Sequence, residues 1–224
     1  MNLNGIGKSA RDLREEAIVY VAAELFLQNG IESVKMTDVA ERAEVGVASL
    51  YRYFGTKDAL VIRAGALLWQ DLHTLFSSVC EAEDFRACTG LERIARLFGI
   101  YRTLYREHPD FIRFVGDFDS FVLRAKPDAE ALREYEARVL DFYPVFRDAF
   151  EAGLRDGSVR PIGDARLYYD AVCHAVMALA QKLLRGEILA SDGFADSAEL
   201  DLLLDMAVAC LRRGEEEREN NGVQ

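Results

Sequence analysis

The sequence contains few residues of the kinds that build metal centres, disulfide frameworks or membrane spans. Its 224 residues include 3 histidines and 4 cysteines, and the cysteines at positions 80, 88, 173 and 210 form no CxxC pair and no zinc-finger spacing. No apolar run approaches the roughly 18 residues of a membrane span, and the first residues contain no signal-peptide core. We therefore expect a cytoplasmic protein that has reduced thiols, binds no metal or cofactor, and does not enter a membrane. Redox sensing by the cysteines is the open alternative.

Proline is also scarce, with 4 residues, and long helical periodicities run between the breakers. Half of the residues are hydrophobic and 29% are charged, which is typical of a soluble globular protein. These features predict an all-α fold. We expect helices over residues 11–28, 56–80, 91–107, 110–124 and 128–155, with Pro144 kinking or splitting the last of them, and a loop over residues 157–164.

An excess of positive charge is missing as well, since the formal net charge is −11. The acidic residues are unevenly distributed, however. Residues 1–65 carry 8 Lys and Arg against 9 Asp and Glu, a net charge of −1, so the remaining residues carry −10. An acidic C-terminal part would repel a nucleic acid and leave the nearly neutral N-terminal part as the end that can approach it.

The segment 35–54 has the pattern of two short helices around a tight turn. Val39 and Ala43 lie four residues apart, as do Leu50 and Phe54, which is the spacing of one helical face. Gly46 interrupts the periodicity and can begin the second helix as its N-cap. This arrangement is a helix-turn-helix (HTH), whose second helix lies in the major groove of DNA.

The residues around this second helix suit DNA contacts. Small side chains at its start would let its backbone approach base edges, and two tyrosines follow whose hydroxyls can reach phosphates. Thr56 can cap a further helix and place Lys57 and free N–H groups at a phosphate. The predicted DNA-binding residues are Thr37, Val47, Ala48, Ser49, Tyr51, Tyr53 and Lys57.

The combined pattern resembles the DNA-binding domain of TetR-family transcriptional regulators, over residues 11 to 65. The residues that carry the resemblance are Val39-Ala40-x-x-Ala43, Val45, and Leu50-Tyr51-x-Tyr53-Phe54-x-x-Lys57-Asp58-x-Leu60. Two features depart from the family pattern. Lys35 stands where a Thr or Ser usually caps the first HTH helix, and Glu44 and Gly46 replace the usual turn glycine and the serine after the valine. A buried helical pair with surface tyrosines is the plain structural alternative.

The resemblance implies an N-terminal three-helix HTH DNA-binding domain followed by a helical ligand-binding and dimerisation domain. We place the first domain at residues 1–65 and the second at 66–224, linked by helix 56–80, after which the acidic segment 81–84 breaks the pattern. The resemblance further implies a small-molecule effector, whose binding moves the fourth helix, changes the separation of the recognition helices in a dimer and weakens operator binding.

The last two helices predict a homodimer. Apolar residues recur at helical spacing from Val172 to Leu183 and from Leu200 to Leu211. Both helices are also apolar beside that face, for example at Met177 and at Met206, so each must be covered on two sides. A second copy of the pair is the natural cover, with Ala175 and Leu204 predicted to lie in the interface, and the resemblance implies the same four-helix bundle. The alternative is that both helices lie in the centre of one core.

Aromatic residues crowd the middle of the second domain, which suits an apolar or planar ligand with few polar groups. Most aromatic residues at helical spacing belong to a core. The candidates for ligand contacts are those with a polar tip that needs a partner when buried: Tyr101, Tyr105, Tyr143, Tyr169 and His174. A histidine within an apolar helix is more often a core residue than a ligand contact.

These features together favour a DNA-binding transcriptional regulator, an effector-responsive repressor that binds a pseudo-palindromic operator as a dimer and is released by a small apolar or aromatic ligand. No nucleophile–base pair, phosphate loop or carboxylate cluster indicates an enzyme. The alternatives are a helical adaptor, or a small-molecule-binding protein or enzyme without operator binding. Operator binding separates the regulator from both, and turnover of a bound compound would reveal the enzyme.

Overall fold

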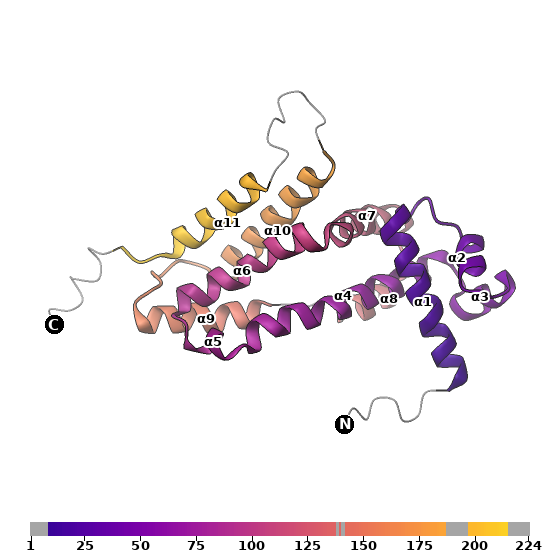
Figure 1. The fold of residues 1–224 in the computed structure, drawn as a ribbon, viewed down its shortest axis with the longest axis horizontal. Helices are drawn as coiled ribbons and strands as arrows, with labels where there is room; N and C mark the ends of the chain where they lie inside the picture. Colours follow the sequence, from indigo (N-terminus) through magenta and orange to yellow (C-terminus); the bar gives the residue numbers. More distant parts are fainter. Residues whose placement is uncertain (1–8, 138, 140–141, 187–196, 215–224) are drawn as a thin grey trace. The chain divides into compact units, whose positions relative to one another are not determined.

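The computed structural model describes residues 9–137, 139, 142–186 and 197–214, which fold into helices α1 to α11 (Figure 1). Within these residues no strand is formed, and the only bridge of strand type joins Val159 and Arg212, so the predicted all-α fold is confirmed. The helices are α1 (Ala10–Asn29), α2 (Met36–Arg42), α3 (Val47–Phe54), α4 (Lys57–Glu81), α5 (Glu83–Ala87), α6 (Gly90–Glu107), α7 (Pro109–Ala125), α8 (Ala129–Glu136), α9 (Tyr143–Asp156), α10 (Ala165–Leu184) and α11 (Ala198–Leu211). None of the helices described combines the length and hydrophobicity that a bilayer crossing requires.

The chain groups into two compact units. The first contains Met1–His73 and Arg113–Leu140, and the second contains Thr74–Ile112 and Asp141–Gln224. Helices α4 and α7 therefore each contribute to both units, and α8 belongs to the first. The expected division at residue 65 falls inside α4 and stays a prediction about function. The two compact units divide the chain differently from this expected boundary, because Phe118 of α7 and Tyr135 of α8 pack against Gly65 of α4.

The first unit starts with a helix whose two ends are set by local chemistry. At its start, the Ser9 hydroxyl accepts a hydrogen bond from the Asp12 backbone N–H, and the Asp12 carboxylate accepts one from the Ser9 N–H. At its end, Gly30 adopts φ +78°, a conformation that a side chain would strain. Helix α1 buries one apolar face, at Ile18, Val19, Ala22, Ala23 and Phe26, and α2 packs on α1 and α3. The HTH thus shares a core with α1.

The predicted helix 128–155 is split rather than kinked. Helix α8 ends at Glu136, and α9 begins at Tyr143 with Pro144 in its first turn. Proline is tolerated there because the backbone N–H groups of the first turn have no partner within the helix. The helices expected over 56–80, 91–107 and 110–124 are confirmed to within one residue at each end.

In the second unit, α6 packs on α9 and α11, and α10 packs on α9 and α11. The backbones of α6 and α9 approach closely at two glycines, since a Cβ on Gly90 would lie 2.1 Å from the Gly153 nitrogen. The start of α6 is held there because its Gly90 N–H donates to the Asp156 carboxylate over 2.8 Å and its Leu91 N–H donates to the Ser158 hydroxyl over 3.1 Å. Burial alone would raise the pKa of Asp156, but hydrogen bonds from Ser158 and Gly90 outweigh it and lower this pKa below its usual value.

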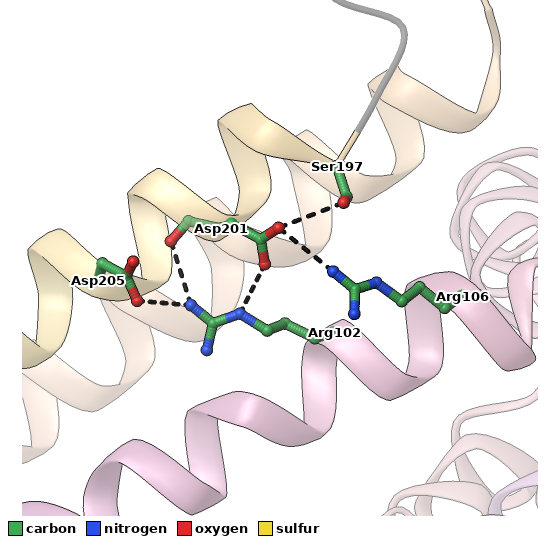
Figure 2. Close-up of polar contacts among 5 residues, drawn as sticks. All are labelled: Arg102, Arg106, Ser197, Asp201 and Asp205. Atoms are coloured by element: carbon green, nitrogen blue, oxygen red, sulfur yellow. Dashed lines mark hydrogen bonds and ion pairs between the residues drawn. The ribbon is translucent and has the colours of Figure 1, made fainter.

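An ion-pair network joins α6 to the start of α11 (Figure 2). The Arg102 guanidinium lies 2.6 Å from the Asp201 carboxylate through Nε and 2.5 Å from Asp205 through Nη2, and Arg106 lies 3.4 Å from Asp201. The Ser197 hydroxyl donates a further hydrogen bond to Asp201 over 3.2 Å. The hydrogen bond from Arg102 lowers the pKa of Asp201 below its usual value. This network stabilises α11 against α6 around one central pair, Arg102 and Asp201, whose side chains are 29% and 32% exposed.

Candidate DNA-binding site and effector region

Helix α3 presents one face to its own unit and the other to solvent. Leu50 and Phe54 are buried, as their spacing predicts, whereas Val47, Ala48 and Tyr51 are exposed. Ser49 and Tyr53 are half-buried at the borders of the exposed face. Gly46 is the N-cap residue, and its carbonyl accepts the Ser49 and Leu50 N–H groups. An HTH recognition helix needs such an exposed face with small side chains in its first turn.

The two departures from the family pattern have local consequences in α2 and the turn after it. Lys35 offers no side-chain acceptor, so the cap of α2 is one-sided, with the Asp38 carboxylate accepting the Lys35 N–H over 2.8 Å. Thr37, two residues after Lys35, is exposed at the start of α2. In the turn, Glu44 has φ +53°, the left-handed region in which glycine is free of strain and most residues are not. The HTH forms despite both departures because Val39, Ala40 and Leu50 are buried.

Lys57 has partners within the chain. Its Nζ donates to the Ile31 carbonyl over 2.5 Å and lies 3.4 Å from the Glu32 carbonyl, in the connection between α1 and α2. Thr56 caps α4 as predicted, because its hydroxyl accepts the Ala59 N–H over 3.2 Å. Lys57 therefore helps to hold the α1–α2 connection against α4. An ammonium group has three donors, so a phosphate contact by Lys57 stays a prediction that adds to this structural role.

Two arginines lie at the ring of Tyr53. The guanidinium carbons of Arg11 in α1 and Arg52 in α3 are each 5.6 Å from the ring centroid. Arg11 also pairs with Glu15 over 3.0 Å, and Glu15 pairs with Arg63 of α4 over 3.2 Å. Helices α1 and α3 thus bring the guanidinium groups of Arg11 and Arg52 together beside Tyr53, an arrangement that suits an anionic partner.

An aromatic group in the first unit connects α4, α7 and α8. Trp69 donates its indole N–H to the Tyr135 hydroxyl over 2.6 Å, and the Tyr135 ring stacks on Phe118 with centroids 4.4 Å apart. Gly65 permits this approach, because a Cβ there would lie 3.0 Å from the Tyr135 ring. Burial raises the pKa of Tyr135 to about 12, against the opposing effect of the hydrogen bond from Trp69. The half of α4 that follows the HTH is thereby joined to α7 and α8.

A second aromatic group lies in the second unit, around Phe146 of α9. Its ring centroid is 5.9 Å from that of Phe98, 6.3 Å from Tyr143 and 5.2 Å from Tyr169. The Tyr143 and Tyr169 rings are themselves 5.7 Å apart. Tyr101 belongs here too: burial, and then its contact with Cys173 and the nearby Tyr169, raise its pKa well above the usual value. The structure therefore places three of the five predicted ligand residues, Tyr101, Tyr143 and Tyr169, in or beside this aromatic group.

The other two candidates lie apart from this group. Tyr105 is half-buried one turn further along α6, and the ring contacts of the group around Phe146 do not include it. His174 is exposed on α10, although it follows Cys173 directly. The interpretation of His174 as a core histidine is therefore wrong, because α10 turns this residue outward. Both stay predictions as ligand contacts.

Comparison with known proteins agrees with the geometry of the HTH. Residues 18–64 match the sequence model of the tetR family of bacterial regulatory proteins. The transcriptional repressor KstR2 of Mycolicibacterium smegmatis is 25% identical over 157 residues, which are 70% of this chain and 72% of that protein. The transcriptional repressor KstR of Mycobacterium tuberculosis is 33% identical over 92 residues, or 41% of this chain and 39% of that protein. The chain belongs to the TetR family of transcriptional regulators.

Solved structures of the TetR family share the fold across most of this chain. The ketosteroid transcriptional regulator KstR2 of Mycobacterium tuberculosis matches with a TM-score of 0.57 and 17% identity, over 90% of this chain and 96% of that one. The repressor FadR of Thermus thermophilus, in complex with lauroyl-CoA, matches with a TM-score of 0.57 and 18% identity, over 90% and 97%. The similarity therefore extends beyond the matched HTH segment to the helices that follow it.

In this TetR-family chain, α10 and α11 each have a buried and an exposed apolar face. Val176 and Ala180 of α10 are buried, as are Leu200, Leu204, Ala207 and Leu211 of α11. On the outer side, Leu167 of α10 is 66% exposed, and Leu202 and Met206 of α11 are 61% and 59% exposed. The outer apolar face, as the term is used below, consists of Leu167, Ala171, Ala175 and Ala178 of α10 and Leu202, Met206 and Ala209 of α11. The predicted Leu204 is a core residue and does not belong to it.

Two features of the site were not predicted from the sequence. One is the pair of arginines at Tyr53, and the other is the hydrogen bond between Trp69 and Tyr135. Arg52 could have been found, because it stands two residues from both Leu50 and Phe54, on the opposite side of the helix. The pairing of Trp69 with Tyr135 spans 66 residues and carries no local signal.

Proposed function

We propose that this chain is an effector-responsive repressor that binds a pseudo-palindromic operator as a homodimer. The observation that carries the proposal is the exposed face of α3, which has small residues in its first turn and is held from behind by buried Leu50 and Phe54. A helix of this form can enter the major groove. Two copies with their recognition helices about 34–36 Å apart would read two half-sites in successive turns of the groove.

The DNA-binding residues of this proposal are the predicted ones. Val47, Ala48 and Ser49 would lie along the base edges, while Tyr51 and Tyr53 would reach the flanking phosphates. Thr37 stands at the exposed start of α2, whose backbone N–H groups can also face a phosphate. Lys57 would contact a phosphate through the ammonium N–H that is not used by the Ile31 and Glu32 carbonyls.

The homodimer of the proposal forms through the outer apolar face. Its leucine and methionine side chains are exposed by about 60% or more, in a region whose inner side already forms a core. Large apolar side chains that are exposed together are typical of an interaction site. A second copy related by two-fold symmetry would cover it with the same residues, because both partners then present one self-complementary surface.

The effector of the proposal is a small molecule with an apolar or aromatic body. The group around Phe146 supplies apolar walls and the hydroxyls of Tyr101, Tyr143 and Tyr169. Among the proteins that share this fold, KstR2 is a ketosteroid transcriptional regulator, and FadR is in complex with lauroyl-CoA. Ketosteroids and lauroyl-CoA both have large apolar parts, which supports the same class of ligand here. Tyr105 and His174 complete the proposed contacts.

Mapping the DNA that purified protein protects within its own genome tests the proposal. The expected result is a small set of fragments that share a pseudo-palindromic sequence, bound by two chains per site as measured by light scattering of the complex. Binding without a shared sequence, or none at all, would contradict the repressor and favour a helical adaptor. Release of the DNA by apolar compounds, without their turnover, would separate the repressor from an enzyme.

A further inference from the structure

The first turn of the recognition helix contains few groups that can read a base. Val47 and Ala48 are exposed but have no polar side-chain atom, and Ser49 offers one hydroxyl. Apolar side chains can contact the methyl group of thymine, but they cannot distinguish guanine by its two major-groove acceptors. A regulator with this first turn needs a donor from elsewhere on the same face.

Arg52 occupies the middle of the exposed face of α3. It lies two residues after Leu50 and two before Phe54, and each two-residue step turns a helix by about 200°. Since Leu50 and Phe54 are buried, Arg52 lies opposite the core. It follows Ala48 and Ser49 by four and three residues, so it shares their side of the helix. Its side chain is exposed.

The guanidinium of Arg52 is positioned but not neutralised. Its Nη2 donates to the Ser49 hydroxyl over 3.5 Å, and its central carbon lies 5.6 Å from the Tyr53 ring centroid. In the described part of the chain it forms no ion pair with a carboxylate. Arg11, by contrast, pairs with the Glu15 carboxylate. The Lys57 ammonium forms its hydrogen bonds with backbone carbonyls. Arg52 therefore keeps donors for a ligand and is oriented by residues of its own helix.

We propose that Arg52 is the principal base-reading residue of this protein and that its guanidinium binds O6 and N7 of one guanine in each half-site. The fork of two parallel N–H donors matches these two acceptors, which no other base presents together in the major groove. Arg52 lies in the second turn of α3, but its side chain is long enough for the guanidinium to reach a base edge from there. Ser49 and Tyr53 orient the guanidinium, so that the Arg52 side chain loses less conformational entropy when it binds. The inference rests on the proposed function, because it assumes that α3 enters the groove.

A phosphate contact is the competing role, and the two roles predict different losses. Loss of a phosphate contact weakens binding to all sequences alike and lowers the salt dependence of affinity, whereas loss of a base contact relaxes specificity at one position. The experiment is a selection from a randomised duplex library, followed by affinities for the selected site and for its single-base variants at several salt concentrations. The proteins are wild type, Arg52→Ala, Arg52→Gln, and Arg147→Ala as a control that removes an exposed arginine of the second unit.

We expect wild type to select a two-fold symmetric site with one strongly preferred guanine in each half-site. Arg52→Ala should lose the preference for that guanine by about 5- to 150-fold while the other positions keep theirs. Arg52→Gln should move the preference toward adenine, because a glutamine amide matches N6 and N7 of adenine. Arg147→Ala should select the wild-type site. Circular dichroism should show folded protein for each variant, since Arg52 is exposed.

Three results would overturn the inference. If Arg52→Ala weakens binding equally for all sequences and lowers the salt slope, Arg52 is a phosphate contact, and the proposed function stands. If both Arg52 variants keep the guanine preference, another residue reads that base, and the proposed function again stands. If wild-type protein selects no sequence at all, the proposed function itself fails, and this inference fails with it.

Discussion

Two exposed faces of this protein present apolar residues to solvent, and they differ in what accompanies those residues. On α3, Val47 and Ala48 lie beside a guanidinium and a tyrosine hydroxyl, all on a short helix of eight residues. On α10 and α11, the outer apolar face places Leu167, Leu202 and Met206 among alanines along two longer helices. Within the described residues the chain covers neither face, so each is open to a partner.

The difference shows which partner each face suits. DNA presents charged backbones and polar base edges, so a face that binds it needs small side chains for close approach together with cations and hydroxyl groups. A second protein chain presents packed hydrocarbon, so a face that binds it needs apolar area and few charges at its centre. The degree of exposure alone does not distinguish the two faces, because Val47 and Met206 are both exposed apolar residues. The two faces are distinguished by the residues that surround these exposed apolar side chains.

The largest effect should come from a pair of substitutions two residues apart on α11. Leu204 is fully buried (0% exposed) and Leu202 is 61% exposed. Leu204→Glu buries a charge without a partner and should unfold the second unit, at a cost of several kcal/mol. Leu202→Glu should leave a folded chain that sediments as a monomer, because the charge becomes buried only on dimerisation. Sedimentation with circular dichroism measures both, and a folded Leu202→Glu dimer would place the interface elsewhere.

On the other face, Ala48→Glu should abolish operator binding and little else. Ala48 is exposed in the first turn of α3, and glutamate is a good helix former, so the melting temperature should stay close to that of wild type. In the groove, the carboxylate would lie between two phosphate backbones, and we expect at least a hundredfold loss of affinity, or about 3 kcal/mol. Fluorescence anisotropy with the selected operator measures the loss. Unfolding of this variant would show that Ala48 faces the core.

A smaller and mixed effect is expected from Lys57→Met, which keeps the aliphatic stem and removes the ammonium. The Ile31 and Glu32 carbonyls lose their partner, so the free energy of unfolding should fall by about 1–2 kcal/mol. If Lys57 also contacts a phosphate, the slope of log affinity against log salt should decrease by about 0.9 per contact. Urea unfolding and salt titration separate the two roles. An unchanged slope with reduced stability would make Lys57 a structural residue only.

The smallest effect should come from Asp201→Asn, and it should depend on pH. Because the hydrogen bond from Arg102 lowers the pKa of Asp201 in the folded state, the carboxylate stabilises the fold above its unfolded-state pKa of about 4. That contribution is lost as the pH falls through the folded-state pKa. Wild type should therefore be more stable than Asp201→Asn by about 0.5–1 kcal/mol at pH 7, and the two should converge as the pH falls through the folded-state pKa of Asp201. A difference that persists in acid would contradict this account.

Local patterns were sufficient to predict most helices and the HTH. The i, i+4 spacing of Leu50 and Phe54 predicted the buried face of α3, Thr56 predicted where α4 begins, and Pro144 predicted an interruption within residues 128–155. Such features depend on residues within one or two turns of each other. Leu204 shows where this reasoning failed. A helix that is apolar on both sides does not indicate from its own sequence which side faces its own core.

The sequence by itself therefore determined the all-α fold, the recognition helix and the apolar character of the last two helices, because each follows from helical periodicity and capping. The tertiary structure alone decided which of those apolar residues are exposed, and it joined Trp69 to Tyr135 and Lys57 to Ile31. It also turned His174 outward while Cys173 contacts Tyr101. The physical reason is that burial and hydrogen bonding between distant segments depend on how helices pack, and packing is set by side chains that lie tens of residues apart.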